Sequence, residues 1–216
     1  MDGSESGVSF TLDQIRSSLL RPEAQDPTPQ DRFAVRFPDG TTLAMLEKVR
    51  EGKDPREAAV LGILSEEADG VSVLLTQRTD TVEEHRGQIA FPGGMREATD
   101  QSLLETALRE TEEEVGIPPS DLEVMTALPA VYIWATNFVA TPYFAIARKP
   151  LQPKANPQEV KEVFHVPLSH LANPDTIVEE EWTLRDHQVV VPFYKWGEKK
   201  IWGATARMLA MLMASL

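Results

Sequence analysis

The sequence predicts an α+β domain in which a mixed β-sheet surrounds a central acidic helix. Short apolar runs separated by turn residues indicate strands on both sides of the middle of the chain. Between Leu104 and Val115, apolar residues recur with the period of a helix and acidic residues occupy the other side. A second apolar repeat, from Trp202 to Leu216, predicts a helix at the end of the chain.

Residues 1–31 are expected to form an extension that precedes a main domain of residues 32–216. Residues 1–9 are polar and are expected to be disordered. The segment Thr11 to Leu20 predicts a short helix, whose apolar side is Leu12, Ile15 and Leu19. Residues 21–31 contain three prolines among charged residues and are interpreted as a linker.

Six further segments have the apolar character of strands. They are residues 58–64, 71–75, 122–128, 139–147, 181–185 and 189–194. A turn at Asp69-Gly70 joins the first pair, and Asp186-His187-Gln188 separates the last pair, which we expect to form a hairpin. In the closing helix, the residues expected to face inward are Ala206, Leu209, Ala210 and Met213.

The central helix has three carboxylates on one face. Glu110, Glu113 and Glu114 stand at i, i+3 and i+4, and the tight turn Gly93-Gly94 precedes the helix. Like charges at this spacing cost a few tenths of a kcal/mol each. Either the face is solvated, or a cation neutralises it, and carboxylate oxygens suit Mg²⁺ or Mn²⁺. The glycine turn, the neighbouring arginine and the closing Gly-Ile favour the metal site.

The segment Arg109-Glu110-Thr111-Glu112-Glu113-Glu114-Val115-Gly116-Ile117 resembles the second half of the Nudix box, with Thr111 at an aliphatic position. The first half is one residue longer than the strict motif, so its early acidic position corresponds to Asp100 or Gln101. The resemblance implies a Nudix-type α/β/α sandwich with a catalytic helix after a glycine-rich loop. It also implies catalytic roles for Arg109, Glu110, Glu113 and Glu114, with the three glutamates as ligands of Mg²⁺ or Mn²⁺.

Two segments upstream of the helix resemble the fingerprint of the coenzyme A diphosphatase subgroup of Nudix hydrolases. They are Leu74 to Thr79 and Gly87 to Gly94. Glu83 departs from the fingerprint, which usually has an arginine there. The resemblance implies substrate-binding roles for Arg78, Arg86, Gln88, Gly93 and Gly94. The alternatives are a surface charge for each arginine and structural hydrogen bonding for Gln88 and for the neighbouring His85.

Two other groups of residues have open interpretations. Tyr132, Trp134 and Phe138 either stack an adenine or belong to the core, and core is the commoner role for such a cluster. Glu159 lies outside the box and is either an additional metal ligand or general base, or a solvated loop residue.

Composition excludes several functional classes. The chain has 216 residues, 42% of them apolar, which suits one domain with a sizeable core. The absence of cysteine excludes disulfides and zinc thiolates, and a net charge of −13 argues against non-specific nucleic-acid binding. No apolar run reaches the ~18 residues that span a membrane, and the N-terminus lacks the features of a secretory signal. We therefore expect a cytoplasmic protein with no nucleic-acid or membrane partner. The sequence leaves its oligomeric state open between a monomer and a homodimer.

The expected activity is metal-dependent hydrolysis of a diphosphate bond in a small nucleotide-like substrate. The subgroup resemblance implies coenzyme A or a derivative, cut to 3′-phosphoadenosine 5′-phosphate and 4′-phosphopantetheine. Another nucleoside diphosphate derivative is the first alternative, for example ADP-ribose, a dinucleotide or an oxidised nucleotide. A nucleotide-binding regulator without turnover is the second alternative, and the complete set of second-half carboxylates argues against it.

Overall fold

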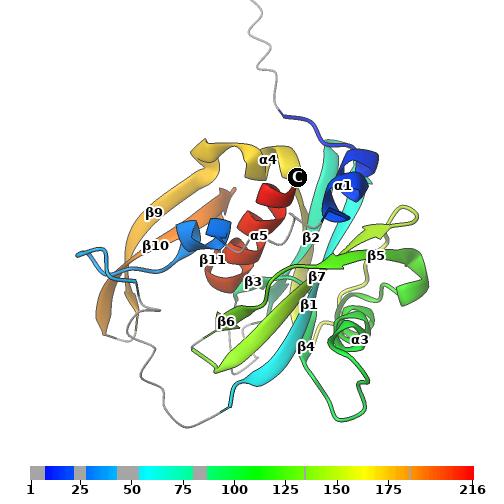
Figure 1. The fold of residues 1–216 in the computed structure, drawn as a ribbon, viewed down its shortest axis with the longest axis horizontal. Helices are drawn as coiled ribbons and strands as arrows, with labels where there is room; N and C mark the ends of the chain where they lie inside the picture. The colour runs from blue at the N-terminus through cyan, green and yellow to red at the C-terminus, as the bar shows by residue number, and fades with distance from the viewer. Residues whose placement is uncertain (1–7, 22–27, 43–53, 80–86, 134, 185) are drawn as a thin grey trace, which may run out of the picture.

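The computed structural model describes residues 8–21, 28–42, 54–79, 87–133, 135–184 and 186–216. These residues form a large mixed sheet with helix α3 on one face and α5 on the other, and a three-stranded sheet lies beside α5 (Figure 1). The predicted α+β fold with a Nudix-type layered sheet is confirmed. No helix in the described ranges is long and apolar enough to cross a membrane.

The described residues contain α-helices, short 3-10 turns and the strands of two sheets. The helices are α1 (Leu12–Leu19), α3 (Leu103–Val115), α4 (Leu168–Ala172) and α5 (Gly203–Ser215), and the 3-10 turns are η2 (Thr28–Phe33), η4 (Pro119–Asp121) and η5 (Pro174–Thr176). The large sheet contains β1 (Arg56–Glu67), β2 (Gly70–Arg78), β3 (Ile89–Ala90), β4 (Gly93–Met95), β5 (Leu122–Ala127), β6 (Val131–Ile133), β7 (Phe138–Ala147) and β8 (Val160–Pro167). The small sheet contains β9 (Ile177–Leu184), β10 (His187–Trp196) and β11 (Lys199–Trp202).

All six predicted strands are present with shifted ends, as β1, β2, β5, β7, β9 and β10. Two turns lie elsewhere than expected. Glu67 pairs with Gly70, so Gly70 opens β2 and the turn precedes it. Leu184 pairs with His187, so His187 belongs to β10 rather than to the hairpin loop. Asp186 has φ 66°, a left-handed conformation that aspartate tolerates and that is common in tight hairpin turns.

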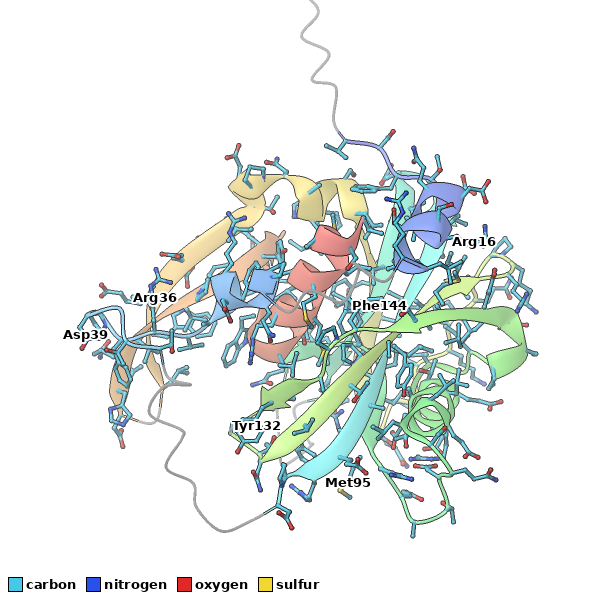
Figure 2. The ribbon with its side chains drawn as sticks, in the orientation of Figure 1. Arg16, Arg36, Asp39, Met95, Tyr132 and Phe144 are labelled. Atoms are coloured by element: carbon cyan, nitrogen blue, oxygen red, sulfur yellow. The ribbon has the colours of Figure 1, made fainter. Side chains whose placement is uncertain are left out.

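Strand β1 lies at the centre of the large sheet and is buried on both faces. It pairs antiparallel with β2 and parallel with β7, which makes the sheet mixed. Ala59, Leu61 and Ile63 pack into the cluster that includes α3, whereas Leu64 packs into the cluster that includes α5. On β7, Phe144 lies in the interior on the α5 side (Figure 2).

The segment that contains β3 and β4 lies between β1 and β2 where these two strands diverge. Near their turn the strands pair with each other, but farther along β4 pairs with β1 and β3 pairs with β2. The carbonyl of Pro92 accepts a hydrogen bond from the Leu61 amide at 2.9 Å. This insertion brings the Gly93-Gly94 turn into the sheet, directly against the face that α3 covers.

Helix α5 is buried on almost every side. Ala206, Leu209 and Ala210 are buried as predicted, and Met213 is partly buried against the same cluster. More than one side of α5 is buried because the 3-10 turn η2 packs on the helix, on the side away from the large sheet (Figure 1). Part of the segment interpreted as a linker is therefore ordered structure: residues 28–31 belong to η2, whose Phe33 ring lies 4.5 Å from the Tyr194 ring.

The predicted N-terminal helix is confirmed as α1 and packs on the domain. Ile15 and Leu19 are each 1% exposed, and Leu12 is partly buried beside them. The side chain of Thr11 caps the helix by accepting from the Gln14 amide. Residues 1–7 lie outside the described residues, and the division of the chain at residue 31 stays a prediction.

Candidate active site

Helix α3 is defined at both ends by its own sequence. The Ser102 hydroxyl accepts a hydrogen bond from the Glu105 amide at 3.1 Å, and Gly116 ends the helix with φ 66°. Thr111, which occupies an aliphatic position of the motif, is fully buried and donates its hydroxyl to the Ala107 carbonyl at 2.7 Å. Because that hydroxyl is satisfied within the helix, threonine packs there as an aliphatic residue would.

The three carboxylates predicted to share a face lie in different environments. The side chain of Glu114 is 3% exposed, that of Glu110 is 16% exposed and that of Glu113 is 55% exposed. Burial raises the pKa of Glu114 to about 8, against the opposing effects of Arg78 and the Gly93 amide. Burial also raises the pKa of Glu110, although its pairing with Arg109 opposes this.

Glu114 joins α3 to the two segments upstream of the box. Its Oε2 accepts from the Gly93 amide at 3.3 Å, and its Oε1 lies 3.4 Å from a terminal guanidinium nitrogen of Arg78. The Nε of Arg78 is buried, and it has no hydrogen-bond partner within the part of the chain that the structure describes. A buried donor of this kind has a capacity that a ligand oxygen would satisfy.

Arg109 holds the loop before α3 and the acidic face together. Its Nε and one terminal nitrogen each donate to a different carboxylate oxygen of Asp100 at 3.0 Å. Its other terminal nitrogen donates to Glu110 at 2.9 Å and to Glu113 at 3.1 Å. This bidentate pair and hydrogen bonding keep the pKa of Asp100 well below its usual range.

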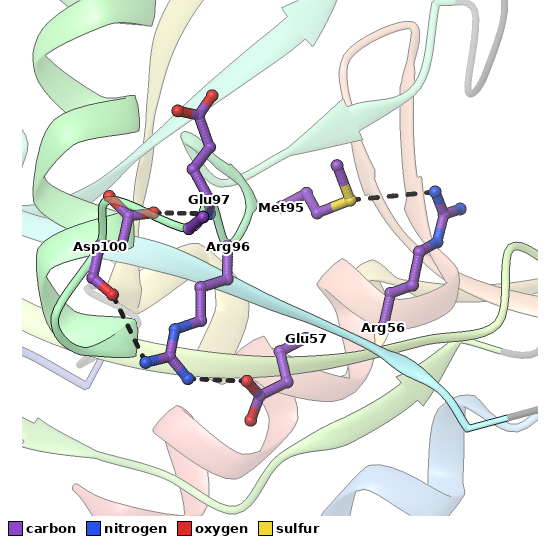
Figure 3. Close-up of a pocket in the computed structure, with 7 residues that line it drawn as sticks. Arg56, Glu57, Met95, Arg96, Glu97 and Asp100 are labelled. Atoms are coloured by element: carbon purple, nitrogen blue, oxygen red, sulfur yellow. Dashed lines mark hydrogen bonds and ion pairs between the residues drawn. The ribbon is translucent and has the colours of Figure 1, made fainter.

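The same contacts distinguish the two candidates for the early acidic position. Asp100 is 6% exposed and also accepts from the Glu97 amide at 2.9 Å (Figure 3). It accepts from the Thr106 hydroxyl at the same distance, 2.9 Å. Gln101 has an exposed side chain. The additional residue of the loop therefore follows Asp100, and Asp100 is the residue that meets Arg109.

The glycine turn is shaped by close contacts on both sides. Gly93 has φ 151°, and a Cβ there would lie 2.4 Å from the carbonyl oxygen of Ala59 on β1. A Cβ on Gly94 would lie 2.5 Å from Cδ of Glu110. Only glycine lets the turn pass this close to β1 and to the Glu110 carboxylate.

Glu159 approaches the acidic helix face from another part of the chain. The Asn156 amide donates to the Glu114 carbonyl at 2.8 Å, and the Thr79 amide donates to the Glu159 carbonyl at 2.9 Å. The negative charge of Glu159 contributes to the raised pKa of both Glu110 and Glu114. The fold thus adds the charge of Glu159, from another part of the chain, to the charges of the α3 carboxylates.

The residues present fit a divalent cation. Among the described residues, no three acidic or histidine side chains converge closely enough to form a ready cage for a metal. However, Glu114 is buried and Glu110 is partly buried beside the Gly93-Gly94 backbone. Burial is the main cause of their raised pKa values, and a bound cation would favour the ionised form of both carboxylates. Carboxylate and carbonyl oxygens are the ligands that Mg²⁺ and Mn²⁺ prefer.

Residues of the 87–100 segment line two cavities. One, of about 370 Å³, lies outside the 95–100 loop, where Arg56 and Arg96 line it together with Glu57 and Met95 (Figure 3). The other, of about 520 Å³, is lined by Gln88 and by two residues that the sequence did not single out, Lys199 and Lys200. The backbone of Gln88 accepts from the Arg78 amide at 3.0 Å.

The remaining candidates are only partly described. Arg86, together with Glu83, His85 and Trp134, lies outside the described residues. Tyr132 is half-buried and donates its hydroxyl to the Asn137 side chain at 2.8 Å. Phe138 packs against the main core, and the Arg56 guanidinium lies 4.1 Å from its ring centre.

Comparisons with known proteins agree with this geometry. The family model of the NUDIX domain matches residues 48–188. The chain is similar to proteins called uncharacterized Nudix hydrolase NudL. It is 37% identical to that of Enterobacter sp. (strain 638) over 193 residues, 88% of this chain and 95% of the relative. It is 36% identical to that of Salmonella paratyphi B over 185 residues, 84% of this chain and 92% of the relative.

A solved structure is similar in fold. The MutT/nudix family protein from Enterococcus faecalis superposes with a TM-score of 0.53 at 18% identity, over 89% of this chain and 73% of that one. The family match and the two relatives together cover the helix, the glycine turn and the strands around them. The chain therefore belongs to the Nudix hydrolases, a family that uses divalent metal ions to hydrolyse diphosphate bonds in nucleoside diphosphate derivatives.

Proposed function

We propose that this protein hydrolyses the diphosphate bond of coenzyme A or a derivative, giving 3′-phosphoadenosine 5′-phosphate and 4′-phosphopantetheine. The observation that carries the proposal is the contact of Glu114 with both Arg78 and Gly93. Arg78 and Gly93 belong to the two segments that resemble the coenzyme A fingerprint, and Glu114 belongs to the Nudix box. These contacts support a single site in which the substrate segments adjoin the acidic helix.

Glu110 and Glu114 are proposed as the principal metal ligands and Glu113 as a further one. When bound, Mg²⁺ or Mn²⁺ supplies Lewis-acid stabilisation of charge on the phosphoryl oxygens and activates water. Glu113 is exposed, and it shares one terminal nitrogen of Arg109 with Glu110, so the two carboxylates lie beside the same cation. A carbonyl of Gly93 or Gly94 is proposed to complete the ligand set, because glycine lets the backbone approach closely.

Arg109 is proposed to act as a positioning residue. Its guanidinium contacts Asp100, Glu110 and Glu113 at the same time, which fixes the side chain of Glu110 relative to the loop. A rigid, planar cation suits this task better than lysine would. Correct placement of the carboxylates matters because small displacements of catalytic groups are costly to the rate.

Substrate phosphates are proposed to meet Arg78, Arg86, Gln88 and the amides of the Gly93-Gly94 turn. Arg78 is the best placed of these, because it already contacts Glu114 and its buried Nε is without a partner among the described residues. Arginine binds phosphate oxygens in a bidentate manner, so the same side chain can keep one contact with Glu114 and donate to the substrate.

The proposal is tested by a substrate panel with Mg²⁺ and with Mn²⁺, with the products identified by mass spectrometry. Coenzyme A, ADP-ribose, a dinucleoside polyphosphate and an oxidised nucleotide are compared by kcat/KM, with Glu114→Gln as the inactive control. We expect coenzyme A to be the best substrate of the panel. Brisk cleavage of ADP-ribose without cleavage of coenzyme A would overturn the proposed substrate and leave the family activity intact.

A further inference from the structure

The cavity of about 520 Å³ lies on the opposite face of the large sheet from α3. Along β2, Leu74 packs with the α3 cluster and Leu75 with the α5 cluster, so the alternation of the strand directs Gln77 to the α5 side. Gln77 lines the cavity together with Gln88, and β11 closes it with Lys199, Lys200 and Trp202.

A residue that lines the cavity, Gln77, directly precedes Arg78 of the proposed active site. Gln77 and Arg78 are neighbours at the end of β2, and their side chains point to opposite faces of the sheet. The Arg78 side chain reaches Glu114 at 3.4 Å, while its amide binds the Gln88 carbonyl at the cavity wall. A substrate that crosses the end of β2 would therefore contact the acidic helix and the cavity with different parts of one molecule.

Lys199 presents an ordered positive charge at this cavity. Its ammonium donates to Glu162 at 2.7 Å, lies 4.8 Å from the Phe164 ring centre, and its side chain is 23% exposed. Glu162 pairs with Gln77 in the β2–β8 register, so the cation stands over the Gln77 end of the cavity. An ammonium has three donors, so the ion pair with Glu162 leaves donors for a second anion.

The other charged residues of the wall are less suited to binding. Lys200 is more exposed than Lys199 and forms an ion pair with Glu180 of β9. Its ammonium also lies near the Trp182 ring of the same strand. Glu198 adds a negative charge to the rim. The net charge of the protein is −13, so an anionic group needs a local cation of this kind to be held away from the metal site.

We infer that this cavity is a second anion subsite, in which Lys199 binds a phosphate monoester of the substrate that is remote from the diphosphate being cut. The inference rests on the proposed function, because coenzyme A carries such a group on its ribose. A substrate without that phosphate leaves the subsite empty. Lysine is suited to this role as a point charge that binds phosphate.

Two substrates that differ only in the ribose phosphate test the subsite. The kcat/KM for coenzyme A and for 3′-dephospho-coenzyme A is measured in the wild type, in Lys199→Gln and in Lys195→Gln. Lys195 is an exposed residue of β10 that does not line the cavity, so it is the matched control. We expect Lys199→Gln to lower kcat/KM for coenzyme A roughly 10-fold or more and to leave dephospho-coenzyme A within about twofold.

Equal losses for the two substrates, or no loss for either, would overturn the subsite. Lys199→Arg, which keeps the charge, should retain most of the preference and controls for a merely structural effect. Binding of adenosine 3′,5′-bisphosphate and of AMP by calorimetry separates this inference from the proposed activity. If the wild type cleaves neither coenzyme A nor its dephospho form, the proposed function fails. The subsite still stands if the bisphosphate binds more tightly than AMP and Lys199→Gln removes the difference, and it falls if the two ligands bind alike.

Discussion

Arg109 and Asp100 form a two-pronged ion pair in which each of two guanidinium nitrogens lies 3.0 Å from a different carboxylate oxygen. Asp100 belongs to the loop after the glycine turn, and Arg109 belongs to the middle of α3. The pair therefore fastens the loop to the helix. Because the same arginine also contacts Glu110 and Glu113, the geometry of the loop is transmitted to the carboxylates.

The first prediction compares the two candidates for the early acidic position of the motif. Asp100→Asn keeps the size of the side chain but removes the charge that pairs with Arg109, so Arg109 loses its anchor and no longer fixes the position of Glu110. We expect kcat to fall on the order of 100-fold, because misplacement of catalytic groups by about 1 Å has effects of that size. Gln101→Asn should leave kcat within about twofold, because the Gln101 side chain is exposed.

Steady-state kinetics of both variants at saturating metal provide the measurement. Circular dichroism and thermal unfolding establish that each variant is folded. A loss of activity in Gln101→Asn that matches the loss in Asp100→Asn would show that the loop as a whole matters, and not the ion pair.

The second prediction concerns the stability of the metal-free protein as a function of pH. Burial raises the pKa of Glu114 from 4.5 to about 8. Between these values the unfolded state releases the proton and the folded state keeps it, so stability falls as pH rises from about 4.5 to 8. The difference is on the order of 3–5 kcal/mol. Asp100 acts in the opposite direction but only at lower pH, because its pKa is lowered from 3.8.

Glu114→Gln is the matched variant for this prediction. We expect it to abolish turnover, to leave the fold intact and to flatten most of the decline in stability between pH 5 and pH 8. The change is measured by urea unfolding at several pH values in the presence of a chelator. A decline as steep in Glu114→Gln as in the wild type would contradict the assignment to Glu114.

Metal should reverse the effect in the wild type. Saturating Mg²⁺ or Mn²⁺ binds the ionised carboxylates and is expected to raise the unfolding midpoint most at pH 8, where ionisation is most complete. Glu114→Gln and Glu110→Gln should each lose most of this stabilisation. Stabilisation by metal that is undiminished in both variants would place the ion elsewhere.

The third prediction separates the two glycines of the turn. Gly94→Ala places a Cβ 2.5 Å from Cδ of Glu110, which is the far end of a flexible side chain. The side chain can move, so we expect a large loss of kcat with a change in stability of about 1 kcal/mol or less. Gly93→Ala meets the backbone of β1 at 2.4 Å and requires φ 151°, so it should destabilise the protein by about 3 kcal/mol or more.

Thermal unfolding and kinetics of the two alanine variants provide the measurement. If Gly93→Ala were as stable as the wild type, the close approach of the turn to β1 would be wrong. If Gly94→Ala kept full activity, the position of the Glu110 carboxylate would not matter for turnover.

The sequence predicts a helix or strand correctly where the residues of that element alone show its periodicity or apolar character. The helical period of α3 and the apolar runs of β1, β2 and β7 are local properties, and all were predicted. Strands β3 and β4 are two and three residues long, too short to show an alternation. Strand β8 contains Lys161 and Glu162, and β11 begins with Lys199-Lys200, so charged residues conceal both.

In the candidate site, too, the sequence predicts what depends on residues close together in the chain and not what depends on contacts between distant segments. Helical spacing places Glu110, Glu113 and Glu114 on one face, but it cannot predict that one is buried and another is exposed, because the neighbours come from other strands. The choice between Asp100 and Gln101 depends on a hydrogen-bond network that forms only when the loop folds against α3. The presence of Lys199 and Gln77 at one cavity depends on how the small sheet packs beside the large one, and no sequence motif predicts that packing.

The last prediction concerns α1, which divides the N-terminal region into a dispensable and a structural part. Residues 1–9 contain only Met1 and Val8 as large apolar residues, and Val8 is 59% exposed, so their deletion should leave kcat and the unfolding midpoint unchanged. Leu19 is 1% exposed and packs into the main core, so Leu19→Ala should destabilise the protein by about 2–5 kcal/mol. Leu20→Ala is the matched control, because Leu20 is 63% exposed and should change stability by less than about 0.5 kcal/mol. Urea unfolding of the deletion and of the two alanine variants measures all three effects. Equal stabilities of Leu19→Ala and Leu20→Ala would mean that α1 does not pack on the domain in solution, and a large loss of activity on deletion of residues 1–9 would give that segment a catalytic role.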